Sequence, residues 1–129
     1  MKLQIPIRIQ SFILSILLNQ TLPLIPLVIE LFYKKTILQS SLVLTASIYS
    51  FTLGIVSINQ MYFGFSILVG LLSGCYYGSV LQTDNALPLQ SNLSFWLIAL
   101  MFLLHTIERF DRHINNREPF FLFNTKEDL

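Results

Sequence analysis

Charged residues are scarce in this chain, and their scarcity argues against a soluble protein. Asp, Glu, Lys and Arg make up 12% of the 129 residues, whereas an ordinary soluble domain contains about 25%. Hydrophobic residues make up 53%, and the mean hydropathy is +0.64. A chain of this composition cannot cover a water-facing surface, so we expect an integral membrane protein embedded in the lipid bilayer.

Cysteine and the groups needed for catalysis are equally sparse. Cys75 is the single cysteine, which excludes an intrachain disulfide and a thiolate metal cluster within one protomer. The sequence offers no nucleophile with a base, no paired carboxylates, no phosphate-binding glycine loop and no set of metal ligands. The net charge of +1 creates no field that would recruit nucleic acid. We therefore expect a protein that is not an enzyme, holds no cofactor or metal and does not bind nucleic acid.

Four stretches with charge-free interiors are long enough for helices that cross the bilayer. A membrane-spanning helix needs roughly 20 apolar residues, and short links make consecutive helices antiparallel neighbours. The expected fold is all-α, with four transmembrane helices in an antiparallel bundle. Residues 1–110 would form the membrane domain, and 111–129 a cytoplasmic tail. The expected spans are 9–33, 37–58, 61–81 and 93–110.

Lysine and arginine are distributed unevenly between the two ends of these spans. One end would carry six of them, and the other would carry only Lys34 and Lys35. Because the cytoplasmic side normally holds the excess, both termini are expected in the cytoplasm, at a bacterial inner membrane. A rival interpretation folds the first span into a re-entrant hairpin at Pro23 and Pro26, which leaves equal numbers on both sides. The six are Lys2, Arg8, Arg109, Arg112, Arg117 and Lys126.

Small residues recur every four positions in the third span, and a second stripe lies in the second span. In lipid, small side chains let two helix backbones approach closely and gain van der Waals contact. The pattern predicts helix packing, either between the two spans or between two copies of the chain in a homo-oligomer. The stripes are Ser66, Gly70, Gly74 and Gly78 in the third span, and Ser47, Ser50, Gly54 and Ser57 in the second.

The first span carries several polar side chains near mid-membrane. Ser11, Ser15 and Asn19 lie four residues apart, and Gln20 follows. A polar amide in hydrocarbon is costly unless it is hydrogen-bonded, so one interpretation is a hydrogen bond between helices. The alternative is a polar path for ions or water near Asn19 and Gln20, where Pro23 would free backbone carbonyls. The spans lack the mid-depth charged group that coupled transporters usually carry.

Charged residues and histidines gather where the fourth span ends. Glu108 and Arg112 are spaced i, i+4, as are Arg109 and His113, on what we expect to be a solvated, salt-bridged helix end. Glu108 and Arg112 carry opposite charges, so their spacing predicts an ion pair. His105 and Glu108 offer two ligands, where a metal site needs about three or four. We therefore expect no metal here.

An aromatic run, Phe120, Phe121 and Phe123, follows Pro119 in the tail. It is too short to span the membrane. The rings would either enter the headgroup region or anchor a cytoplasmic protein, because phenylalanine is favoured at interface cores.

These features of the sequence are compatible with two candidate functions. The first is a non-enzymatic membrane subunit that self-associates and docks a cytoplasmic protein partner through its tail. Such subunits include membrane components of multiprotein complexes, bacterial immunity and phage-defence assemblies among them. The alternative is a small oligomeric ion channel or transporter whose polar path runs near Asn19 and Gln20.

Overall fold

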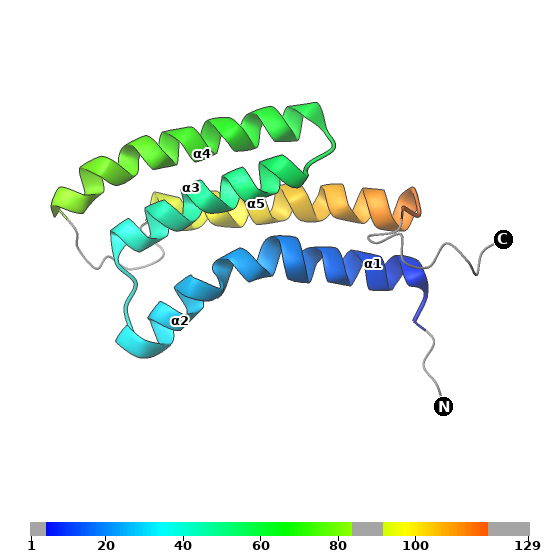
Figure 1. Cartoon of the computed structure of the whole chain (residues 1–129), viewed down its shortest axis with the longest axis horizontal. Helices are drawn as coiled ribbons and strands as arrows, with labels where there is room; N and C mark the ends of the chain where they lie inside the picture. The colour runs from blue at the N-terminus through cyan, green and yellow to red at the C-terminus, as the bar shows by residue number, and fades with distance from the viewer. Residues whose placement is uncertain (1–4, 84–91, 119–129) are drawn as a thin grey trace.

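The computed structural model describes residues 5–83 and 92–118, and it is all-helical over these ranges (Figure 1). A first helix combines α1 (Ile7–Ser15), the π-helical turn η1 (Ile16–Thr21), the 3-10 turn η2 (Leu22–Leu24) and α2 (Ile25–Lys34). It is followed by α3 (Gln39–Val56), α4 (Gln60–Val80), the 3-10 turn η3 (Leu81–Thr83), α5 (Leu93–Phe110) and the π-helical turn η5 (Asp111–Asn115).

Over the described residues, these elements join into four continuous helices that are long and apolar enough to cross a membrane. This confirms the all-helical fold and the four candidate spans. Large apolar side chains remain exposed on every one of them, as with Phe32, Ile55 and Leu72. Such surfaces are a liability in water and ordinary in lipid. The last helix continues beyond the expected boundary at residue 110. The four helices are Ile7–Lys34, Gln39–Val56, Gln60–Thr83 and Leu93–Asn115.

The first helix bends without reversing its direction, as Figure 1 shows between α1 and α2. Proline lacks an N–H donor, and its ring clashes with the carbonyl four residues earlier. Pro23 and Pro26 therefore force the helix out of α geometry, and the π and 3-10 turns lie directly before and around Pro23. The chain remains helical from Ile7 to Lys34, so the rival re-entrant hairpin is wrong.

The π turn changes which polar residue of the first helix faces the protein interior. A π turn contains one residue more than an α turn, so a buried face continues at i+5 rather than i+4. Ser11 and Ser15 are buried four residues apart, and the next buried position is Gln20, five residues after Ser15. Asn19, expected on this face, is only half-buried.

Helix ends are set by local polar groups. Asn59 precedes α4 and its side chain accepts a hydrogen bond from the Met61 N–H at 2.9 Å. Asn92 does the same for Ser94 before α5, at 3.0 Å. These side chains satisfy N–H groups that have no partner within the first helical turn. Lys35 ends α2 in the left-handed region, with φ of 57°, and starts the short link to α3.

Helix α3 is the central element of the bundle. It contributes half of the buried apolar side chains, Leu42, Val43, Ala46, Tyr49 and Leu53, and it contacts the first helix, α4 and α5. Helix α4 packs mainly on α3 and has few contacts with α5. The arrangement leaves much of the α4 surface exposed, as expected for a peripheral helix in lipid.

Small residues line the contact between α3 and α4. A Cβ added at Gly54 would lie 2.9 Å from the Ser66 Cβ, and one at Gly70 would lie 3.0 Å from the Phe51 ring. Ser47 donates a hydrogen bond from Oγ to the Gly70 carbonyl at 2.8 Å. These contacts let the two backbones approach closely.

The other stripe residues occupy different positions relative to this contact. A Cβ at Gly74 would approach Ser47 Oγ at 3.2 Å, whereas one at Gly78 would meet nothing within 4 Å. Ser50 is buried in α3, and Ser66 is buried in α4. Gly78 is therefore the stripe residue that the fold of one chain leaves open.

Replacing Gly54 with leucine is expected to lower the free energy of unfolding by about 1–3 kcal/mol, the usual cost of overpacking. The clash would be with Ser66 Cβ, which cannot move without its backbone. Gly78→Leu is the matched control, because the exchange of glycine for leucine raises helix propensity by the same amount, about 1 kcal/mol. The new side chain at position 78 would meet no neighbouring atom. Unfolding in mixed micelles, followed by circular dichroism, measures both, and equal losses would contradict the close approach of α3 and α4.

Candidate functional site

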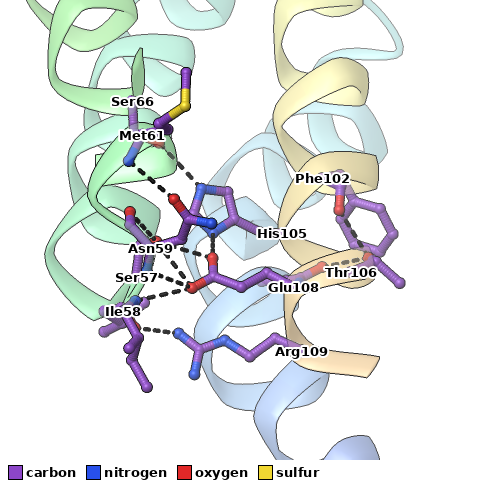
Figure 2. Close-up of polar contacts among 12 residues, drawn as sticks. Ser57, Ile58, Asn59, Met61, Ser66, Phe102, His105, Thr106, Glu108 and Arg109 are labelled. Carbon is purple, nitrogen blue, oxygen red and sulfur yellow. Dashed lines mark hydrogen bonds and ion pairs between the residues drawn. The ribbon is translucent and has the colours of Figure 1, made fainter. Parts of the chain in front are cut away.

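Charged and polar side chains gather at one end of the bundle, where the last turns of α5 face the link between α3 and α4 (Figure 2). Helix α5 contributes His105, Glu108 and Arg109, and the link Ser57–Asn59 contributes backbone and hydroxyl groups. We call this group of side chains and link residues the capping cluster. The Ile7 end of the first helix lies at the same end, since the rings of Phe12 and Phe110 are 5.7 Å apart.

Glu108 accepts hydrogen bonds at the start of α4. Its Oε1 accepts from the Ile58 N–H at 2.8 Å and from the Asn59 N–H at 3.3 Å. The hydroxyl of Ser57 lies 2.9 Å from both carboxylate oxygens. The N-terminus of a helix carries a partial positive charge and unpaired N–H groups. The carboxylate therefore compensates the dipole of α4 while it binds the link.

Arg109 acts at the adjoining end of α3. Its guanidinium donates to the carbonyl of Val56, the last residue of that helix. The residue is 2% exposed. A cation at a helix C-terminus is favourable because the last carbonyls carry partial negative charge. Two adjacent residues of α5 thus place opposite charges on the two helix ends that meet at Ser57–Asn59.

His105 connects Glu108 to the interior of α4. Its Nδ1 lies 3.2 Å from Glu108 Oε2, and its Nε2 lies 3.0 Å from Ser66 Oγ. A carboxylate only accepts, so Nδ1 carries the proton in this contact, and the serine hydroxyl is the hydrogen-bond partner of Nε2. The chain of contacts links α5 to the face of α4 that packs on α3.

The order serine, histidine, carboxylate is also that of a nucleophilic triad, so its access to substrate decides its chemistry. Ser66 and His105 are both fully buried. Ser66 lies in the middle of α4, against the close approach at Gly54. A substrate carbonyl has no route to Ser66 Oγ, and helical N–H groups already bonded to carbonyls cannot form an oxyanion hole. The arrangement therefore orders the helix interface.

The end of α5 folds back through a compact turn. Arg112 Nε donates to Glu118 Oε2 at 2.7 Å, and the Glu118 N–H donates to the Arg112 carbonyl at 3.1 Å. His113 Nδ1 lies 2.7 Å from the Glu118 carbonyl oxygen, and its side chain is buried. Arg117 adopts a left-handed conformation with φ of 58°, which reverses the chain direction.

The ion pair expected between Glu108 and Arg112 is wrong. Glu108 and Arg109 face the link between α3 and α4, and Arg112 pairs with Glu118 instead. One signal in the sequence could have shown this, because the buried positions of α5 continue at four-residue intervals through His105, Arg109 and His113. A charged residue on a core-facing stripe needs a buried partner.

The two residues expected to line a polar path, Asn19 and Gln20, differ in burial. Gln20 is fully buried, and its Oε1 accepts a hydrogen bond from Thr106 Oγ1 at 2.8 Å. Thr106 also contacts the Phe102 carbonyl at 2.7 Å. Gln20 therefore links the first helix to α5, while Asn19 lies half-buried beside it.

The described residues contain no group of three or more His, Cys, Asp or Glu that could hold a metal ion. The candidate docking residues Phe120, Phe121 and Phe123 lie outside the described residues. Comparison of the chain with known protein families, curated proteins and solved structures found no match.

A groove of about 470 Å³ lies beside the capping cluster. Its volume is in the range of pockets that hold small ligands or side chains of a partner, about 300–1,000 Å³. The lining combines four apolar or aromatic side chains with a polar rim. The lining residues are Ile58, Asn59, Tyr62, Ile107, Glu108, Phe110, Asp111, Arg112, Asn115, Asn116 and Glu118.

Glu108→Ala is expected to lower the free energy of unfolding by at least about 2 kcal/mol, because the Ile58 and Asn59 N–H groups lose their acceptor. Glu118→Ala is the matched control. It removes a carboxylate that pairs with Arg112 but is half-exposed, so its cost should stay below about 1 kcal/mol. Chemical unfolding of the purified protein measures both, and similar losses would show that Glu108 has no capping role.

Proposed function

We propose that the protein is a non-enzymatic membrane subunit that docks a cytoplasmic protein at the end of the bundle that carries the capping cluster. In this proposal four antiparallel helices cross a bacterial inner membrane, and both termini lie in the cytoplasm. The observation that carries the proposal is the contrast between this hydrogen-bonded polar end with its groove and the apolar side chains exposed along the helices. A water-soluble partner is favoured only at the polar end.

Charge supports this orientation. Among the described residues, Arg8, Arg109, Arg112 and Arg117 belong to the end where α1 begins and α5 finishes. The opposite end carries Lys34 and Lys35, and Lys34 is paired with Glu30 at 3.4 Å. The cytoplasmic side of a membrane protein normally holds the excess of Lys and Arg.

The alternative of an oligomeric channel has less support. A pore between copies of the chain needs polar side chains on the outer surface, whereas Gln20 is buried and bonded to Thr106 within one chain. The centre of the bundle is filled by Leu42, Tyr49 and Leu53. Self-association stays in the proposal for the exposed surface of α4, where Gly78 has no neighbour within 4 Å.

Topology is testable with single cysteines in a Cys75→Ser background. Asn116→Cys should react with a membrane-impermeant maleimide only from the cytoplasmic side, and Thr36→Cys only from the opposite side. Both positions are exposed and neither carries charge, so the substitutions leave the charge asymmetry intact. Labelling of right-side-out and inverted vesicles gives the answer, and reaction of both cysteines from one side would contradict the three crossings proposed between these two positions.

Partner docking is testable through the tail. Deletion of 119–129 should leave the four helices inserted, because their hydrophobic length and the remaining arginines still direct insertion. Phe120→Ala with Phe121→Ala should weaken capture of the partner at least about tenfold, through the loss of two aromatic anchors. Asn124→Ala with Thr125→Ala is the control within the same segment.

The measurement is a pull-down from solubilised membranes, quantified for the full chain and each variant. Capture that survives both the deletion and the double phenylalanine variant would exclude the tail as the docking segment. The polar end of the bundle would then have to bind the partner directly.

A further inference from the structure

The groove beside the capping cluster is amphiphilic in a way that restricts what it can bind. Ile58, Ile107 and Phe110 are exposed to it, with Tyr62 as a further aromatic wall. Exposed apolar side chains at the end of a helix, next to charged ones, favour an occupant with an apolar part. Burial of apolar surface stabilises a bound segment by about 25 cal/mol for each Å² that is removed from water.

The charges of the lining disfavour a lipid phosphate as that occupant. Three carboxylates, those of Glu108, Asp111 and Glu118, face one guanidinium, that of Arg112. This guanidinium already donates to Glu118 at 2.7 Å. An anionic headgroup would therefore approach a surface of its own sign without an available cation.

The chain itself arrives at the rim of the groove. Glu118 is both the last residue that the structure describes and part of the groove lining. Its side chain and backbone are held by Arg112 and His113, as described above. Two residues further along, the sequence continues with Phe120-Phe121-Leu122-Phe123. At about 3.5 Å per residue, the Cα atom of Phe120 can lie at most roughly 7 Å from that of Glu118.

We propose that the aromatic segment 120–123 binds in this groove of its own chain. An apolar run begins two residues after Glu118, which itself lines the groove, and polar residues follow this run, so that they can remain in water. The short tether gives the segment a high effective concentration at the groove. The same phenylalanines that would dock a cytoplasmic protein are then covered until that protein displaces them. The intramolecular contact does not depend on such a partner.

Disulfide trapping in purified protein in liposomes tests this contact. In a Cys75→Ser background, Ile58→Cys is combined in turn with Phe120→Cys, Phe121→Cys and Phe123→Cys. Ile58 is 61% exposed and lines the groove. Under mild oxidation, at least one pair should form an intramolecular disulfide, which requires Cα atoms about 4.4–6.8 Å apart. Non-reducing gels and peptide mass spectrometry identify the product.

The control pairs replace Ile58→Cys with Met61→Cys. Met61 is 81% exposed and close in sequence but does not line the groove. Trapping should be at least about tenfold faster at Ile58 than at Met61, because only a docked tail has a high effective concentration there. Equal rates at the two positions, as for a tail lying freely in the headgroup region, would overturn the proposal. Disulfide-linked dimers would overturn it as well, because they would place the tail in a second copy.

Discussion

The fold depends on the contact between adjacent charges of α5 and the two helix ends that meet at Ser57–Asn59. Glu108 binds the start of α4, and Arg109 binds the last carbonyl of α3. Each charge compensates a helix dipole of opposite sign, so a partly buried carboxylate and a buried guanidinium become favourable where isolated ones would be costly. The contact joins the α3–α4 pair to α5. Since η5 and α1 pack against each other, it also positions the first helix.

Polar side chains elsewhere in the bundle have the same structural role on a smaller scale. Ser47 bonds to the Gly70 carbonyl, His105 contacts Ser66, and Gln20 accepts from Thr106. Apolar side chains gain little by leaving lipid, so hydrogen bonds and close backbone contacts set which helices pair. All three contacts point into the protein. Among the described residues, the polar end with its groove and the exposed side of α4 are the surfaces on which the proposed binding of proteins rests.

Much of the fold could be predicted from the sequence, and less of the site. Hydrophobic length is a local property, so the four spans were found within a few residues, except that the last helix runs on to Asn115. The sequence singles out His105, Glu108 and Arg109, but it predicts Arg112 as the partner of Glu108, whereas Glu108 binds the link between α3 and α4. Spacing of i, i+4 indicates which residues share a helix face. The spacing does not indicate whether that face meets water or another part of the protein. Here the face meets the link between α3 and α4, some fifty residues earlier in the chain.

By itself, the sequence determined the all-helical fold and the number of candidate spans, because composition and apolar length act over one segment at a time. Only the tertiary structure decided that Glu108 and Arg109 cap other helices, and that Gly54 faces Ser66. It also decided that Gln20 rather than Asn19 is buried, through a π turn before Pro23. Each of these outcomes depends on which backbone lies opposite a side chain, and that requires the helices to be packed together.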